Sequence, residues 1–197
     1  MTAARTSDDY YDPRIDARVF KLLPGACRVG AGGGVIATLL GSCVAACLYD
    51  PEAGIGGMNH FLLPDAGPAD RTEALLSSGA RYGVFAMESL INELLAAGAR
   101  REQLRVKLFG GARVLPRLSD VGRRNIDFAR NFVSVEGLTL VGEDLGGEQP
   151  RKLIMYPESG RVLVRRLPQV ESRTIAAADT HYLRRMDTPV EGSVELF

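Results

Sequence analysis

A cysteine and a histidine on opposite sides of a predicted turn are the residues of this sequence best placed for covalent chemistry. Cys43 lies in the apolar run 39–50, His60 lies in the apolar run 55–63, and a Pro/Gly-containing turn at 51–54 separates the two runs. Short apolar runs bounded by such turn residues are typical of adjacent β-strands. The pattern therefore predicts a β-hairpin that carries a Cys/His pair.

The register of this hairpin decides whether the two side chains can meet. A turn centred on its glutamate and alanine pairs Cys47 with Met58 and Ala45 with His60. Cys43 then shares a sheet face with His60 as its diagonal neighbour, and such neighbours lie about 7–8 Å apart at the backbone. A slip of one residue would move the histidine to the opposite face. The prediction of a reacting pair therefore depends on this register.

A cysteine within reach of a histidine can act as a nucleophile. The thiolate is the reactive form of cysteine, and an imidazole that takes the thiol proton leaves a thiolate–imidazolium pair at neutral pH. Gly41 and Ser42 precede the cysteine, and the backbone amides of this segment are candidate donors to an oxyanion or a bound substrate. The alternative is that Cys43 and Cys47 are two small buried residues of a central strand.

Zinc binding by Cys43, Cys47 and His60 is a further alternative. A closed structural zinc site needs four ligands, and these residues supply fewer. In a strand the two cysteines lie about 13 Å apart along the backbone, so one ion cannot bridge both without a bend. We therefore expect no metal and no cofactor.

Segments along most of the chain resemble one known family. They are Gly-Ser-Cys-Val at 41–44, Cys-Leu-Tyr-Asp-Pro at 47–51, Gly-Gly-Met-Asn-His-Phe-Leu-Leu-Pro at 56–64, Lys-Leu-Phe-Gly-Gly-Ala at 107–112, Gly-Arg-Arg-Asn at 122–125, Glu-Asp-Leu-Gly-Gly at 143–147 and Gly-Arg-Val-Leu-Val at 160–164. In this order they resemble the signature of CheD, the bacterial chemoreceptor glutamine deamidase family, over roughly residues 20 to 168.

The resemblance implies an activity and a set of partners. It implies deamidation of specific glutamine side chains to glutamate in the cytoplasmic helices of chemoreceptors, the methyl-accepting chemotaxis proteins, through a cysteine thioester. It implies Cys43 as the nucleophile and His60 as the general acid and base, and Thr38 is the nearest match to the family's threonine upstream of the cysteine. It also implies a CheC-type phosphatase as a possible partner.

The residue pattern by itself leaves other functions open. Deamidases, proteases and transglutaminases share the attack of a thiolate on a carboxamide or peptide carbonyl, so the pattern does not choose among them. A regulatory module that binds a chemotaxis partner and catalyses nothing is also open. Faster alkylation of Cys43 than of Cys27 or Cys47 would indicate an activated nucleophile rather than three core cysteines.

Composition favours a cytoplasmic protein with one core. The chain has 197 residues, 46% of them hydrophobic, which is enough for a sizeable core in a single domain. Its 24 lysines and arginines balance 24 aspartates and glutamates, so no overall field attracts nucleic acid or an anionic membrane. Three cysteines make no disulfide framework and favour a reducing compartment. No segment is typical of a signal peptide or a membrane span, and we expect no membrane insertion.

The order of predicted elements indicates the fold class. We expect a flexible leader at 1–17, a CheD-like deamidase domain at 18–168 and a C-terminal tail at 169–197. Helical periodicity runs over 70–98 and 122–136, with short strands before, between and after. These elements predict an α/β layered sandwich of one domain, in which helices cover a mixed, largely antiparallel sheet.

Overall fold

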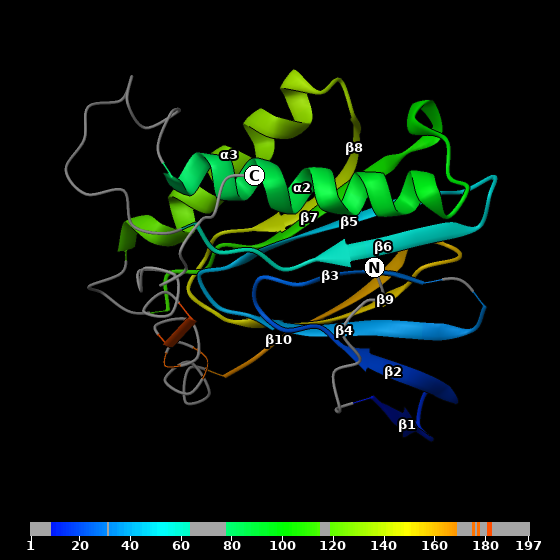
Figure 1. Ribbon diagram of the computed structural model, residues 1–197. Helices are drawn as coiled ribbons and strands as arrows, with labels where there is room; N and C mark the ends of the chain where they lie inside the picture. The colour runs from blue at the N-terminus through cyan, green and yellow to red at the C-terminus, as the bar shows by residue number, and fades with distance from the viewer. Residues whose placement is uncertain are drawn as a thin grey trace, which may run out of the picture.

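The chain forms two β-sheets packed face to face, with helices over one of them. The computed structural model describes residues 9–30, 32–63, 78–114 and 119–168, together with residues 175, 177, 181 and 182. Figure 1 shows the layers: helices α2 and α3 lie over the sheet that contains β5, β6 and β7, and the sheet that contains β2 and β4 lies on the other side.

The sheet farther from the helices, called sheet A, has the strand order β1-β2-β4-β9-β10 within the described residues. Its strands are β1 (Tyr10–Asp12), β2 (Ala17–Lys21), β4 (Gly34–Leu40), β9 (Arg151–Tyr156) and β10 (Arg161–Arg166). β2 and β4 run parallel, whereas the other neighbours are antiparallel. Sheet A is therefore mixed, and β4 is one of its inner strands.

The sheet under the helices, called sheet B, has the strand order β3-β6-β5-β7-β8 within the described residues. Its strands are β3 (Cys27–Gly30), β6 (Ile55–Asn59), β5 (Val44–Asp50), β7 (Arg105–Gly110) and β8 (Thr139–Leu145). β7 and β8 run parallel, and the remaining pairs are antiparallel. The β5–β6 hairpin thus lies at the centre of sheet B.

Strand β5 is buried on both faces, which explains its continuous apolar sequence. Ala46 and Leu48 belong to the core between sheet B and the helices. Ala45 and Cys47 point the other way, into the core between the two sheets. We call this second core the intersheet layer. All four side chains are fully buried, so the alternation along β5 separates two cores rather than a core and solvent.

Helices α2 (Ser78–Ala96) and α3 (Ser119–Val135) cover the outer face of sheet B, and a short 3-10 helix (Arg101–Gln103) follows α2. A Cβ at Gly83 of α2 would lie 2.6 Å from the Phe128 ring of α3, so glycine allows the two helices to approach closely. The predicted helix start near residue 70 lies outside the described residues. Neither helix in the described ranges combines the length and the apolar character needed to cross a membrane.

The predicted α/β class is confirmed, including helices that cover a mixed, largely antiparallel sheet. The strands divide between two sheets, whereas the sequence predicted one. The physical reason is that the chain leaves sheet A at the end of β4 and enters sheet B at β5, while β4 pairs with the distant β9 through partners such as Thr38 and Leu153. A pairing of this range has no local signal in the sequence.

The described part of the segment predicted as a leader at 1–17 contains regular structure. Tyr10–Asp12 form strand β1, which pairs with β2. The Asp12 carboxylate closes the following turn by accepting hydrogen bonds from the backbone and guanidinium N–H groups of Arg14 at 3.0 and 2.8 Å. Residues 1–8, and most of the predicted tail at 169–197, lie outside the described residues; the described Ile175 is buried.

Candidate active site

Cys43 lies where the chain crosses from one sheet to the other. Strand β4 of sheet A ends at Leu40, strand β5 of sheet B begins at Val44, and only residues 41–43 connect them. We call residues 41–43 the nucleophile loop. The Cys43 side chain is fully buried and belongs to the intersheet layer. The crossing therefore places the thiol between the two sheets, near the end of β4.

The predicted hairpin register is confirmed. Cys47 pairs with Met58, and the same register continues to an isolated pair between Val44 and Phe61. The backbones of that last pair exchange N–H···O hydrogen bonds of 3.0 and 2.9 Å. In this register Cys43 and His60 stand on the same face of the hairpin as diagonal neighbours.

The backbone of His60 is held from its other side by the segment before β3. His60 N–H donates to the Ala26 carbonyl at 3.0 Å, and Gly25 N–H donates to the His60 carbonyl at 2.7 Å. His60 thus lies between the β5 side and the β3 side of sheet B, and its side chain is only 2% exposed. Hydrogen bonds on both sides fix the position of its backbone.

Thr38 of β4 sets the tautomer of His60. The Thr38 hydroxyl donates to the Leu22 carbonyl at 2.8 Å, and its oxygen lies 2.8 Å from His60 Nδ1. A hydroxyl has one proton to donate and the carbonyl can only accept, so Nδ1 must carry the proton that reaches Thr38. The lone pair of the neutral ring is then on Nε2. This arrangement leaves Nε2 able to accept a proton.

Burial determines the charge of this imidazole. His60 Nε2 is buried and has no hydrogen-bond partner among the described residues. Removal from water lowers the pKa of His60 to about 3, against which a backbone hydrogen bond at Leu22 acts in the opposite direction. The ring is therefore neutral at neutral pH. A neutral imidazole differs from the thiolate–imidazolium pair considered from the sequence.

The carbonyl groups of the nucleophile loop are all held by elements downstream in the chain. Ala112 N–H donates to the Gly41 carbonyl at 2.8 Å, and Gly111 N–H donates to the Cys43 carbonyl at 2.7 Å. Asn125 of α3 donates from Nδ2 to the Ser42 carbonyl at 2.8 Å. Because each peptide is planar, these bonds fix the orientation of the loop amides.

The glycine that ends β7 allows this close contact. Gly110 has a φ of +110°, and a Cβ there would lie 2.2 Å from the Cys43 carbonyl oxygen. Gly122 of α3 also approaches this segment closely, because a Cβ there would lie 2.7 Å from the Gly111 carbonyl oxygen. The absence of these side chains lets β7, α3 and the nucleophile loop pack backbone to backbone.

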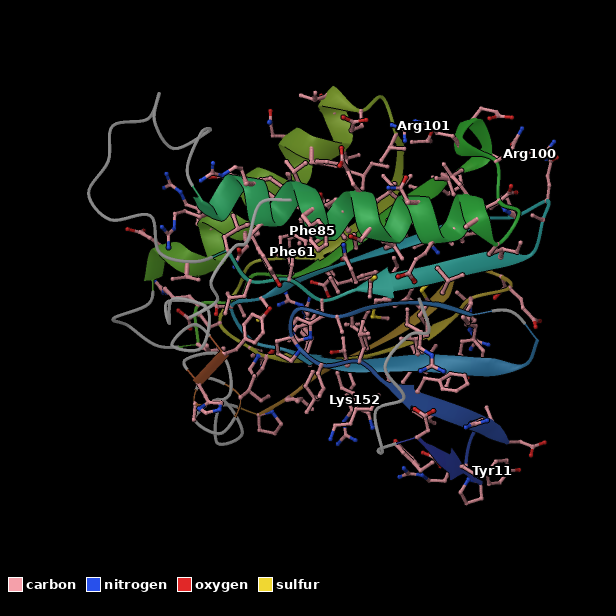
Figure 2. All side chains as sticks on the ribbon, in the orientation of Figure 1. Tyr11, Phe61, Phe85, Arg100, Arg101 and Lys152 are labelled. Atoms are coloured by element: carbon pink, nitrogen blue, oxygen red, sulfur yellow. The ribbon has the colours of Figure 1, made fainter. Side chains whose placement is uncertain are left out.

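Thr38 and His60 line a cavity of about 480 Å³. Leu22, Leu39 and Ile175 give this cavity an apolar wall, and Lys21 and Lys152 also line it. Figure 2 shows Lys152 on the side of sheet A that faces away from the helices. The cavity therefore gives a route toward His60 from that side of the molecule.

Tyrosine side chains lie near Cys43 on the side of α2. The hydroxyl groups of Tyr82 and Tyr182 share a hydrogen bond, and Tyr182 packs against the intersheet layer. A Cβ at Gly25 would clash with Tyr182, so this glycine makes room for the ring. Burial, the bond to Tyr182 and the nearby Cys43 all raise the pKa of Tyr82. Tyr82 is therefore a neutral hydroxyl close to the thiol.

The other two cysteines have environments that suppress reactivity. Burial raises the pKa of Cys47 well above its usual range. Burial and a hydrogen bond to Glu93 at 3.3 Å raise the pKa of Cys27 to about 12. Both are therefore protonated at neutral pH. Across the described ranges, no group of three or more histidine, cysteine, aspartate or glutamate side chains is placed to hold a metal ion.

The structure joins Thr38 to His60 at hydrogen-bond distance and puts Cys43, which follows the Gly41–Ser42 backbone, on the same face of the hairpin as His60. Their catalytic roles stay predictions. Sequence reasoning gave neither Tyr82 nor Asn125 a role at the site. Asn125 did carry a signal, because it lies on the apolar stripe of α3 with Ala129, where a polar residue needs partners inside the fold.

A family model described as CheD chemotactic sensory transduction matches residues 62–166. The match begins at residue 62, so it includes neither His60 nor Cys43. A crystal structure of a Neisseria meningitidis protein is similar over 68% of this chain and 66% of its own, with a TM-score of 0.44 and 10% sequence identity.

Curated relatives align over nearly the whole chain. A Halorhodospira halophila protein named probable chemoreceptor glutamine deamidase CheD is 49% identical over 191 residues, covering 95% of this chain and 88% of that protein. Proteins of the same name from Hydrogenovibrio crunogenus and Janthinobacterium sp. are 46% and 47% identical, cover 94% and 95% of this chain, and are themselves covered over 97% and 93%. The chain belongs to the CheD family.

Proposed function

We propose that this protein is a chemoreceptor glutamine deamidase that uses Cys43 as its nucleophile and His60 as its general base and acid. Family membership supports the reaction, because the relatives named above are probable chemoreceptor glutamine deamidases. The observation that carries the proposal is the Thr38–His60 hydrogen bond of 2.8 Å, which directs the free lone pair of a neutral imidazole to Nε2. The register of the hairpin, which puts His60 and Cys43 on one face, supports the pairing of these two residues.

In the first half-reaction the thiol attacks the side-chain carboxamide of a glutamine. Cys43 Sγ forms a bond to the carboxamide carbon while His60 Nε2 takes the thiol proton. The carbonyl oxygen becomes an oxyanion, for which the backbone amides at Gly41 and Ser42 are the proposed donors. The C–N bond then breaks, His60 returns the proton to the leaving nitrogen, and ammonia departs from a thioester.

In the second half-reaction water replaces the thiol. His60 Nε2 takes a proton from water as the water oxygen attacks the thioester carbon. The C–S bond breaks, the proton passes to the departing sulfur, and the substrate leaves as glutamate. The role of Thr38 throughout is to hold the ring in one tautomer and one orientation, because its hydroxyl is itself anchored on the Leu22 carbonyl.

The proposed substrates are glutamines in the cytoplasmic helices of chemoreceptors. A cytoplasmic location follows from that substrate and stays a prediction, as does the partnership with a CheC-type phosphatase. We also propose residues 18–168 as the deamidase domain, with residues 10–17 extending its sheet A. Conversion of glutamine to glutamate adds one negative charge at each modified site, which is the proposed signal to the receptor.

The direct test incubates the protein with a receptor cytoplasmic fragment and follows tryptic peptides by mass spectrometry. The wild type should add about 1 Da at specific glutamines, the difference between a carboxamide and a carboxylic acid. Cys43→Ala should add none. Cys47→Ala is the matched control, because this cysteine is equally buried in the same intersheet layer and burial raises the pKa of its thiol.

The outcomes separate two classes of function. Deamidation by the wild type and by Cys47→Ala, but not by Cys43→Ala, supports the proposed enzyme. No mass gain with several different receptor fragments would contradict it and favour a binding module. Equal activity of Cys43→Ala and the wild type would show that another residue is the nucleophile.

A further inference from the structure

Asn125 stands at a specific place in the β5–β6 ladder. The register that pairs Val44 with Phe61 puts Ser42 opposite Leu63 at the next hydrogen-bonded position. At that position the connection runs through a side chain. Leu63 N–H donates to Asn125 Oδ1 at 2.9 Å, and Asn125 Nδ2 donates to the Ser42 carbonyl at 2.8 Å. The carboxamide of α3 is inserted between the two strands.

This insertion changes the spacing of the strands beside the thiol. Two hydrogen bonds in series, with a carboxamide between them, hold the backbones farther apart than the single N–H···O bond of a regular ladder. Ser42 precedes Cys43, and Leu63 follows the segment that carries His60. Asn125 therefore joins the nucleophile loop to the base-bearing strand and keeps them separated at the same time.

The asparagine is itself rigidly placed. Its side chain is 0% exposed, and the helix that carries it packs at Gly122 against the Gly111 carbonyl. That same segment donates N–H bonds to the Gly41 and Cys43 carbonyls, on either side of the Ser42 carbonyl that Asn125 holds. The position of the nucleophile loop is thus determined by three consecutive carbonyl contacts, of which only the Asn125 contact also reaches the His60 strand.

We propose that Asn125 is a positioning residue for the deamidation reaction: its carboxamide holds the Ser42–Cys43 peptide and the Leu63 backbone apart, and so sets where Cys43 stands relative to His60. This inference rests on the proposed function. Asn125 lies behind the loop and does not belong to the cavity that contains His60 and Thr38. Its removal should therefore impair the chemical step much more than substrate binding.

The test compares Asn125→Ala with Asn125→Asp. Alanine removes both hydrogen bonds, whereas an ionised aspartate keeps the acceptor for Leu63 N–H and loses the donor to the Ser42 carbonyl. Both variants should lower kcat for receptor deamidation about 30- to 100-fold per folded molecule, with KM within about 2-fold, because a misplacement of about 1 Å has effects of this size. If alanine prevents folding, the isosteric aspartate variant still gives the answer.

Asp50→Ala is the matched control for lost stability. Asp50 is also fully buried and also accepts backbone N–H bonds, but it lies at the opposite end of the same hairpin. It should lower the melting temperature as much as Asn125→Ala does and leave kcat per folded molecule unchanged. Asn125 variants that lower the melting temperature and keep wild-type kcat would overturn the inference and make Asn125 a purely structural residue.

A second measurement does not depend on the substrate. Iodoacetamide alkylation at neutral pH is followed for Cys43 by peptide mass spectrometry, with Cys27 in the same molecule as the reference thiol. The Asn125 variants should slow alkylation of Cys43 at least about 10-fold relative to Cys27. If the wild type deamidates no receptor but this slowing occurs, the proposed function fails and the positioning role stands. If the wild type deamidates receptors and neither the deamidation rate nor the alkylation rate falls in the variants, the proposed function stands and the positioning role fails.

Discussion

The two ends of the β5–β6 hairpin each bury a titratable side chain, and the fold treats the two in opposite ways. At the turn end Asp50 is 0% exposed, and Figure 2 shows Arg100 beside this turn. Asp50 accepts hydrogen bonds from the backbone N–H groups of Glu52, Ala53 and Arg100 at 2.9, 3.0 and 2.9 Å. Burial by itself would raise the pKa of Asp50, but these bonds outweigh it and hold the pKa below the usual value.

At the other, open end of the hairpin, only one of the two ring nitrogens of His60 has a hydrogen-bond partner among the described residues. His60 is 2% exposed, and its Nδ1 meets the Thr38 hydroxyl. Nε2 has no partner within the described part of the chain. Here burial dominates and lowers the pKa of His60 to about 3. The open end therefore buries a neutral imidazole whose Nε2 has no partner in the described part of the chain, on the same hairpin face as Cys43.

The difference shows how to separate a structural polar residue from a reactive one. A buried polar group with all its partners is explained by the fold it stabilises. A buried polar group that lacks a partner is unfavourable for folding, so another role must account for its retention. Asp50 belongs to the first class and His60 to the second, although both lie in the same pair of strands.

The largest effect that tests this comparison is loss of the base. His60→Gln should lower receptor deamidation about 1,000-fold, or about 4 kcal/mol of transition-state stabilisation, because it removes the general base and acid. Single-turnover mass spectrometry measures the rate. Circular dichroism should show a folded protein, since the glutamine carboxamide can keep a polar contact with the Thr38 hydroxyl. Retention of activity within about 10-fold would assign the base to another residue.

The opposite end should respond in the opposite way. Asp50→Ala should reduce the free energy of unfolding by about 3 kcal/mol, because three buried backbone N–H groups lose their acceptor. Urea unfolding at neutral pH measures this loss. Deamidation per folded molecule should match the wild type. A large fall in that activity, with an intact fold, would show that the two ends of the hairpin are coupled.

The hairpin that carries both groups was predictable because its information is local. The Pro/Gly turn at 51–54 and the apolar alternation on either side set the register, and the structure has that register. Cys43 and His60 were found for the same reason. Thr38 was proposed through the family resemblance, and its contact with His60 crosses between two sheets, which spacing along the chain does not reveal.

What the sequence did not predict depends on long-range pairing. Residues 34–40 and 44–50 read as consecutive strands, yet one pairs with β9 in sheet A and the other with β6 and β7 in sheet B. Gly110 packs against the Cys43 carbonyl, a contact between segments far apart in the chain that local patterns do not reveal. Asn125 reaches that loop from a helix, so its role becomes visible only when α3 is placed.

A smaller effect tests how the open end holds its base. Thr38→Val preserves the shape of the side chain but removes the hydroxyl that links the Leu22 carbonyl to His60 Nδ1. The rate of deamidation should fall about 10- to 30-fold, because the ring loses its fixed tautomer and orientation. Thr38→Ser keeps the hydroxyl and should stay within about 3-fold of the wild type. Equal rates for valine and serine would mean that Thr38 only fills space.

The smallest effect distinguishes the two ends by pH. The pKa of His60 falls from 6.5 to about 3 on folding, so below 6.5 the unfolded chain binds a proton that the folded chain does not. The free energy of unfolding is therefore highest, with respect to this group, above pH 6.5. It falls as the pH is lowered toward 3, by about 1 kcal/mol over the first unit below pH 6.5. Asp50, with a pKa below its usual 3.8, contributes no decline in that first unit. Urea unfolding between pH 7.5 and about 5.5 should therefore show an acid-dependent loss in the wild type that is reduced in His60→Gln. Parallel curves for the two proteins would mean that the imidazole is charged in the folded state and that water reaches the His60 ring.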